Sequence, residues 1–272
     1  MAKSDDRATS CALRGLLVSR SAHAQARIAM SGGRDREQAE ADAARYAVTI
    51  DDVTQVDERL SLRAWLSDIH SALTGSASDF RDTEIVLRSH NSTPIERPIL
   101  VQASDVPRAI EKLESTIYRN AALGSIERIS LLYYEVLRVH PFSDGNGRTA
   151  RVLVAGMLRS LHRSDHSLDL APLLSTALNL HNHYLAAERS GETYASWVRF
   201  FAGVVDAEIQ LQTRIEASLR RLNAEERIML AHELGVIQQS LGIVGPSAVP
   251  YDAARAPCSP NVFNILRALG LS

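Results

Sequence analysis

His-Pro-Phe-Ser-Asp-Gly-Asn-Gly-Arg-Thr-Ala-Arg, residues 140–151, is the stretch that decides how this 272-residue chain folds. It follows an apolar periodic run from Ile126 to Val139, which predicts a helix. A proline disfavours helical geometry in the residue before it, so we expect that helix to end near His140. A second helical run begins at about Gly147. Between the two helices we expect a tight loop, because glycine permits positive φ and close approach of the backbone to a ligand.

This loop has the chemistry of a polyphosphate site. Backbone N–H groups at a helix N-terminus bind anions, and Arg148 and Arg151, three residues apart, can share one face at that end. Asp144 offers a hard oxygen ligand for a Mg²⁺ that bridges phosphate oxygens. His140 stands at the other rim, where a neutral imidazole can take a proton from a hydroxyl. The plainer interpretation is a capped helix–loop–helix turn with two solvated arginines. We expect Phe142 to point into the core and hold the loop in place.

At these residues the chain resembles the Fic-domain proteins. Their signature, His-Pro-Phe-x-Asp-Gly-Asn-Gly-Arg-x-x-Arg, is matched at every fixed position, and a weaker similarity extends from about Asp51 to Val205. The resemblance implies a mainly α-helical protein, a Fic-fold helical bundle with a short β-hairpin flap. It also implies transfer of AMP from ATP to a hydroxyl side chain of a target protein.

The resemblance gives each residue of the motif a role. His140 would be the general base, and Asp144 would hold the Mg²⁺ that accompanies ATP. The other residues would bind the phosphates of ATP: Gly145, Asn146 and Gly147 as an anion hole for the α- and β-phosphates, Arg148 as a further phosphate contact, and Arg151 at the γ-phosphate.

The chain divides into three predicted parts: an N-terminal helical segment (1–50), a Fic domain (51–205) and a C-terminal helical extension (206–272). We expect Asp51 or Asp52 to cap a helix that runs to about Leu73. Residues 83–101 are β-rich at both ends and turn-like in the middle, which predicts a hairpin. In the family this hairpin is the flap that covers the active site and docks the target by strand addition. A plain surface hairpin is the alternative.

Composition limits the classes of partner. An apolar content of 45% is ample for a core, and a net charge of −2 gives no electrostatic reason to expect nucleic acid or an anionic membrane as a partner. No apolar run approaches the ~18 residues of a membrane span, and residues 1–20 do not resemble a secretory signal. The two cysteines form no disulfide framework. We therefore expect a cytoplasmic protein, with delivery to another cell as an effector left open.

Four histidines lie close together in the sequence and raise the question of a zinc site. The sequence has neither paired cysteines nor a His-Glu-x-x-His arrangement beside them, so we interpret them as solvated or capping residues. They are His162, His166, His181 and His183. Many Fic proteins have an aromatic pair near the adenine where this chain has His181 and Asn182, so its nucleotide preference stays open.

The N-terminal segment bears on regulation. Many Fic proteins are held inactive by the glutamate of a Ser/Thr-x-x-x-Glu-Gly/Asn motif, whose carboxylate pairs with the second arginine of the signature, here Arg151. No glutamate of this chain is followed by glycine or asparagine. The nearest candidate begins at Ser21 and has Gln25 where the glutamate would stand. A neutral amide cannot form the bidentate ion pair, so either the chain is constitutively active or a partner protein supplies the carboxylate. An ordinary helix is the alternative.

The resemblance therefore leads us to expect a protein adenylyltransferase that uses Mg-ATP. The enzymatic alternative is the same fold with another donor, in UMP, phosphoryl or phosphocholine transfer. The non-enzymatic alternative is a nucleotide-binding regulatory module. The target protein and the oligomeric state stay open.

Overall fold

The chain forms a predominantly helical structure, seen in a computed structural model. The structure describes residues 2–53, 61–77, 79–85, 100–119, 123–162, 166, 168–176, 181, 183, 191–241, 243 and 259–271, with side chains from residue 8 onward. The helices are α1 (Ala2–Ser31), α2 (Arg36–Asp52), α3 (Leu62–Thr74), the 3₁₀ turn η1 (Ala103–Asp105), α4 (Val106–Arg119), α5 (Ser125–Val139), α6 (Asn146–His162), α7 (Ala171–Thr176), α9 (Gly191–Arg221), α10 (Ala224–Ser240) and α11 (Pro260–Ala268).

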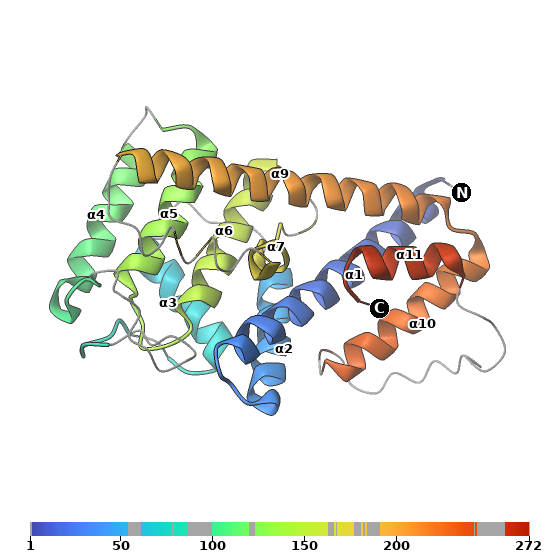
Figure 1. The fold of residues 1–272 in the computed structure, drawn as a ribbon, viewed down its shortest axis with the longest axis horizontal. Helices are drawn as coiled ribbons and strands as arrows, with labels where there is room; N and C mark the ends of the chain where they lie inside the picture. Colours follow the sequence, from blue (N-terminus) through green and yellow to red (C-terminus); the bar gives the residue numbers. More distant parts are fainter. Residues whose placement is uncertain are drawn as a thin grey trace.

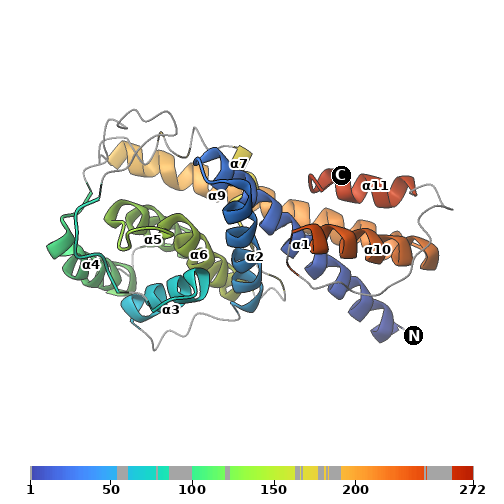
Figure 2. The ribbon, with the colours of Figure 1, turned by 90° about the horizontal axis from the view of Figure 1, so that it is seen from below.

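The long helix α9 runs along the whole molecule, as Figure 1 shows. Helices α3 to α6 gather beneath one half of α9, and α10 and α11 lie near its other half (Figures 1 and 2). Helix α1 crosses between the two groups and packs along α2, α7, α9 and α10. In the part of the chain that the structure describes, no helix is both long and apolar enough to cross a membrane.

The predicted mainly α fold is confirmed, and the described residues contain no strand. The predicted hairpin has its middle, residues 86–99, outside the described residues, so the flap stays a prediction. The boundaries at residues 50 and 205 also stay predictions. Helices α2 and α9 each run across one of them without a break.

The predicted start of the third helix was wrong. Asp51 and Asp52 form the last turn of α2, and α3 begins instead after Ser61, whose hydroxyl accepts a hydrogen bond from the Ala64 N–H at 3.2 Å. Serine and aspartate cap helices with similar preference, so the cap residue alone could not distinguish these positions. Gly75 ends α3 in the left-handed region, and Asn223 caps α10.

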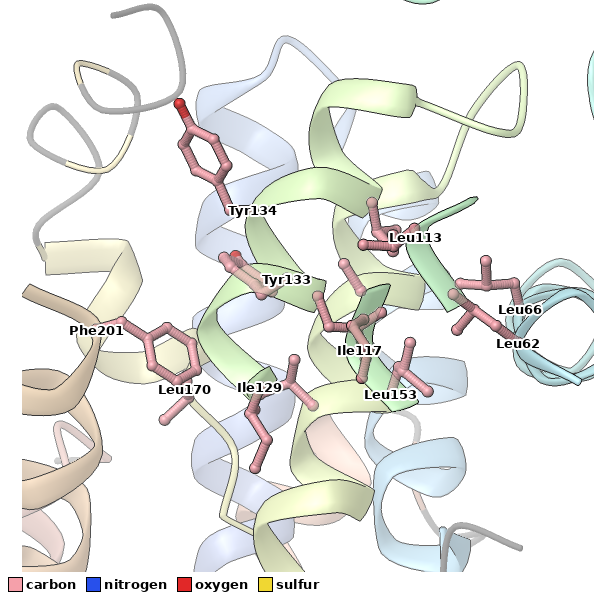
Figure 3. Close-up of a cluster of buried hydrophobic side chains, with 14 of the residues drawn as sticks. Leu62, Leu66, Leu113, Ile117, Ile129, Tyr133, Tyr134, Leu153, Leu170 and Phe201 are labelled. Atoms are coloured by element: carbon pink, nitrogen blue, oxygen red, sulfur yellow. The ribbon is translucent and has the colours of Figure 1, made fainter. Parts of the chain in front are cut away.

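A large apolar cluster beneath α9 holds the helices around the signature loop. Figure 3 shows that Leu62 and Leu66 of α3 point toward Leu113 and Ile117 of α4. Phe142 of the loop belongs to the same cluster and is 1% exposed, which confirms its expected place in the core. Three aromatic residues of α9 are also here, Trp197 and Phe201 as buried members and Phe200 as a partly buried neighbour.

A second apolar cluster joins the start of α1 to the end of α9, to α10 and to α11. Between the two clusters lies a buried ion pair, in which Arg20 Nη1 of α1 donates to both carboxylate oxygens of Glu208 on α9, at 2.7 and 2.8 Å. An unpaired charge at such a depth would be costly, so each of these residues requires the other. The pair fixes α1 against α9. It thereby places the helical hairpin formed by α1 and α2 beside the signature loop.

Candidate active site

The signature loop is closed by one side chain. Asn146 Oδ1 accepts a hydrogen bond from the Phe142 N–H at 2.9 Å, and its Nδ2 donates to the Phe142 carbonyl at 2.7 Å. Asn146 is 1% exposed, so these bonds form away from competing water. The amide is thus used inside the loop, and the part of Asn146 left for an anion is its backbone N–H, at the first position of α6.

The ring of Phe142 is held from two sides. His70 of α3 stacks on it with ring centroids 3.9 Å apart, and Phe80 meets it edge-on at 5.6 Å. His70 Nε2 lies 3.0 Å from the Asp144 carbonyl oxygen. A carbonyl only accepts, so Nε2 must carry the hydrogen. His70 therefore fixes both the anchor of the loop and the backbone beside Gly145.

Two glycines let neighbouring side chains approach the loop. Gly145 has φ +74°, and a Cβ there would lie 3.2 Å from His70 Nε2. A Cβ on Gly147 would lie 3.2 Å from Arg151 Nη1, so the Arg151 guanidinium rests against the start of α6. By helix geometry the first N–H groups of α6 lack an acceptor within the helix, and the Thr149 N–H makes the first such bond, to the Gly145 carbonyl at 2.9 Å. The loop therefore has the backbone donors expected of an anion site.

His140 ends α5 in a strained conformation. Its φ of 53° and ψ of 63° lie in the left-handed region. Among the described residues, no other non-glycine residue has a positive φ. The imidazole is half-buried, and its Nδ1 lies 3.2 Å from the Leu137 carbonyl oxygen. That acceptor places the hydrogen on Nδ1 and leaves the lone pair on Nε2. Burial lowers the pKa of His140, and the positive charge of Arg81 lowers this pKa further, so the neutral form prevails at neutral pH.

Asp144 is the most exposed charged residue of the motif, with 63% of its side chain accessible. Its Oδ2 accepts hydrogen bonds from Arg34, in the turn between α1 and α2, and from Arg148 Nη2 at 3.3 Å. Burial raises the pKa of Asp144, but the hydrogen bonds from Arg34 and the Gly145 N–H, with the charges of Arg34 and Arg148, hold that pKa below its usual value. The carboxylate is therefore ionised.

Arg148 is paired with a buried acid from α2. Its Nη1 lies 3.0 Å from Asp42 Oδ1, and Asp42 also pairs with Arg34 at 2.9 Å and with Arg45 at 3.1 Å. The Asp42 side chain is only 3% exposed. One buried carboxylate thus contacts three guanidinium groups, which makes Asp42 the electrostatic centre of the contact between α2 and the signature loop.

Arg151 is covered by α1 and α2. Its Nη2 donates to Gln25 Oε1 at 2.6 Å, and its guanidinium carbon lies 5.6 Å from the centre of the Tyr46 ring. Tyr46 is fully buried and donates to Asp169 Oδ1 at 2.7 Å. Gln25 thus contacts Arg151, the second arginine of the motif. This is the contact expected of a residue that stands where other Fic proteins have the inhibitory glutamate.

The structure brings all the predicted motif residues together around one loop. It adds three residues that the sequence reasoning missed, and two of them had a detectable signal. His70 lies in the apolar stripe of α3 between Leu66 and Leu73, and Asp42 lies three residues after the buried Ala39. A polar residue on a buried face requires a partner. Arg34 follows a double glycine, and nothing in its local sequence indicated its contact with Asp144.

The histidines form no metal site in the described residues, which contain no cluster of three or more His, Cys, Asp or Glu side chains able to hold a metal ion. For His181 the expectation of a solvated or capping residue was wrong, because it is 7% exposed. Its Nε2 lies 3.1 Å from the Tyr133 hydroxyl, and Trp197 packs against its ring. A buried tyrosine hydroxyl needs a hydrogen-bond partner, and His181 supplies it.

Comparison with known proteins points to one family. Residues 59–158 match the Fic/DOC family. The chain is similar to "Protein adenylyltransferase fic-1" of Caenorhabditis briggsae, with 30% identity over 109 residues, which are 40% of this chain and 19% of that protein. It is also similar to "Uridine 5'-monophosphate transferase" of Xanthomonas campestris pv. campestris (strain 8004), with 34% identity over 80 residues, 29% of this chain and 14% of that protein.

The chain therefore spans about a fifth or less of the length of these two curated relatives. Among solved structures, a Fic family protein from Desulfovibrio desulfuricans G20 has a TM-score of 0.54 and 18% identity, over 88% of this chain and 76% of that chain. That similarity concerns the fold. The matched residues 59–158 lie within the segment 51–205 predicted as the Fic domain.

The crowding at Gly145 predicts a measurable stability difference. Gly145→Ala and Gly75→Ala place an alanine at nearly equal positive φ, +74° and +75°, but a Cβ at Gly75 meets nothing within 4 Å. Both changes should cost about 1–2 kcal/mol for the left-handed conformation. Gly145→Ala should cost about 1–3 kcal/mol more, because the new Cβ overpacks His70. Urea unfolding measures both values. In a His70→Ala background the excess should vanish, and equal losses in the wild-type background would contradict this account.

Proposed function

Because residues 59–158 form a Fic/DOC family domain, we propose that this protein transfers AMP from Mg-ATP to a Ser, Thr or Tyr hydroxyl of a target protein and releases pyrophosphate. The observation that carries the proposal is the complete signature loop. In it a neutral histidine, an ionised aspartate, the donors at the start of α6 and two arginines meet at one place. Relatives named as transferases, the adenylyltransferase and the UMP transferase, support a nucleotidyl transfer reaction.

His140 is suited to act as the base of this reaction. The hydrogen bond between Nδ1–H and the Leu137 carbonyl directs the Nε2 lone pair away from α5. We propose that Nε2 removes the proton of the target hydroxyl as its oxygen attacks the α-phosphorus and the bond to the pyrophosphate oxygen breaks. Because the pKa of His140 lies below its usual value, the base remains available at neutral and mildly acidic pH.

The phosphates have a matching set of donors. The N–H groups that open α6 face the α- and β-phosphates in our proposal, with Arg148 beside them and Arg151 at the γ-phosphate. Asp144 fits a Mg²⁺ site, because its carboxylate is ionised and exposed, and Mg²⁺ is commonly held by one or two carboxylates together with substrate phosphates. When bound, the ion would neutralise the charge of the phosphates.

In the structure these groups already have partners from the hairpin of α1 and α2. Arg34 holds a positive charge beside Asp144, where Mg²⁺ would stand. Asp42 holds a negative charge beside Arg148, where a phosphate would stand, and Gln25 covers Arg151. We propose that ATP must displace the contacts at Asp144 and Arg151 for productive binding. Gln25 is a neutral substitute for the inhibitory glutamate of other Fic proteins, and its restraint is correspondingly weaker.

Two further elements belong to the proposal. The target protein would dock on the segment near residues 83–101, and an inhibitory partner protein could supply the carboxylate that this chain lacks at position 25.

UMP transfer is the second candidate reaction, favoured by the 34% identity to the UMP transferase. Phosphoryl transfer is distinguished by the γ-label in the first experiment below, whereas phosphocholine transfer and a non-catalytic nucleotide-binding role would each leave both labels of ATP untransferred.

The reaction is tested with ATP labelled separately at the α- and γ-phosphates. The wild-type chain should transfer the α-label to protein and leave the γ-label in pyrophosphate. His140→Ala should lower α-label transfer by about 10²-fold or more, because a general base is lost, while ATP binding survives. The exposed His23→Ala on α1 is the matched control. Transfer of the γ-label would indicate a kinase, labelling from UTP alone a uridylyltransferase, and near-wild-type transfer by His140→Ala would refute the assigned base.

The metal site is tested by calorimetry of ATP binding with and without Mg²⁺. Asp144→Ala should abolish the Mg²⁺ dependence, because it removes the carboxylate ligand. Arg34→Gln should tighten Mg-ATP binding by about tenfold, since it removes one competing charged hydrogen bond. Arg36→Gln is the control, because Arg36 lies two residues away with 84% of its side chain exposed and pairs with Glu40. A Mg²⁺ dependence unchanged in Asp144→Ala would place the metal elsewhere.

The restraint on Arg151 is tested by comparing self-modification in one gel. Gln25→Glu should lower activity by about tenfold or more, because a buried carboxylate would form an ion pair with Arg151 and reorient the γ-phosphate. Gln25→Ala should raise activity, since the bond at 2.6 Å is lost. Gln239→Glu adds the same charge at an exposed position on α10 and should change nothing. If both Gln25 variants behave like the wild type, α1 has no inhibitory role.

A further inference from the structure

Arg81 is a buried cation that donates to backbone carbonyl groups, among them those of Val139 and His140 at the active site. It precedes the segment 83–101, and its side chain is fully buried. Its Nε donates to the His140 carbonyl at 2.8 Å, and its own backbone N–H donates to the Pro141 carbonyl at 2.8 Å. Nη2 also reaches the Val139 carbonyl, at a longer 3.4 Å. Arg81 thus satisfies the carbonyl groups at the C-terminus of α5 that no helical N–H can reach.

The same guanidinium also binds both ends of the segment 83–101. Nη1 donates to the Thr83 carbonyl at 3.2 Å, and Nη2 donates to the Val101 carbonyl. Glu84 reinforces this junction, because its Oε1 accepts the Ala103 N–H at 2.7 Å while its Oε2 lies 3.7 Å from Arg81 Nη1. One side chain therefore connects the two ends of this segment to the last residues of α5.

The contacts of Arg81 explain how His140 keeps its strained backbone. A left-handed conformation is unfavourable for a non-glycine residue, so the surrounding structure must impose it. Here Pro141 excludes a continued helix, the His140 N–H donates to the Val136 carbonyl at 3.0 Å, and Arg81 holds the His140 carbonyl. Among the contacts of the described residues, Arg81 is the one of these three that also reaches the ends of the segment 83–101.

We propose that Arg81 is a positioning residue, which sets the orientation of His140 and couples it to the segment 83–101 that docks the target protein. The proposal rests on the function proposed above. Arginine is required because its planar fork donates in several directions at once, whereas the single nitrogen of a lysine cannot bridge carbonyl groups on both sides. If docking of a target shifts either end of the segment, Arg81 would then change the position of the general base, His140.

The test compares Arg81→Gln and Arg81→Lys with Arg63→Gln in the full chain. Arg63 is an exposed arginine nearby, whose guanidinium carbon lies 5.1 Å from the centre of the Phe80 ring, so it controls for a lost cation. Three measurements are made on each variant: the kinetics of α-label transfer, which give kcat and KM, an NMR titration of the His140 ring, which gives its pKa, and the backbone chemical shifts of His140. Thermal unfolding gives the folded fraction.

Both Arg81 variants should lower kcat by about 10²-fold with little change in KM for ATP, because the base is misplaced while the phosphate contacts remain. Two charged groups act on the imidazole, Arg81 and Asp144. Arg81→Gln should therefore raise the pKa of His140, while Arg81→Lys keeps the charge and the pKa. The backbone shifts of His140 should move away from the left-handed conformation in both variants. Arg63→Gln should match the wild type.

The proposal is overturned if both folded variants keep kcat within about twofold of the wild type. It is also overturned if kcat falls only in proportion to the folded fraction, since that would be a purely structural role. If Arg81→Gln does not fold, Arg81→Lys decides alone. If the wild-type chain transfers nothing from ATP, the proposed function fails, and the NMR measurements still test Arg81: unchanged His140 shifts and pKa in the variants would refute its positioning role.

Discussion

The site depends on the reciprocal pair of hydrogen bonds between the Asn146 side chain and the backbone of Phe142. This pair closes the loop over a single turn and fixes where α6 begins relative to the end of α5. The ring of Phe142 and the N–H groups that open α6 lie on either side of that closure. A loop that depends on one buried amide is rigid, and rigidity is what an anion site needs if its donors are to be aligned before the ligand arrives.

The electrostatics of the site show a second constraint. Asp42, Arg34 and Gln25 reach the loop from one helical hairpin, and with the motif residues they form a nearly neutral, partly buried network. Without the ligand, two motif arginines so close together would repel each other and require counter-charges. The hairpin supplies one of them, Asp42, to Arg148, and its neutral Gln25 accepts a hydrogen bond from Arg151. The arrangement thus stabilises the loop through contacts that, in the proposed function, a nucleotide would have to displace, which would link the stability of the fold to the affinity of the site.

The sequence was sufficient for the helical class, for the loop between two helices and for the contact between Gln25 and Arg151. These follow from local periodicity, from a proline and glycines at fixed positions, and from a family signature. It was insufficient for Asp42, Arg34 and Arg81, because their roles depend on partners more than 50 residues away along the chain. The misplaced start of α3 has a different cause: several residues could cap that helix, and tertiary packing selected Ser61.

Helix α1 has a consequence for how the site can open. Leu13, Leu16 and Leu17 belong to the second apolar cluster, and Arg20 is locked to Glu208. Lifting the whole helix away would therefore expose a core and break a buried ion pair. A change of rotamer at Gln25 and Arg34 has a smaller free-energy cost. The side chain of Arg34 is nearly one-third exposed. A change at these two side chains would break the contacts with Arg151 and Asp144 while α1 keeps its contacts with α9 and the second apolar cluster.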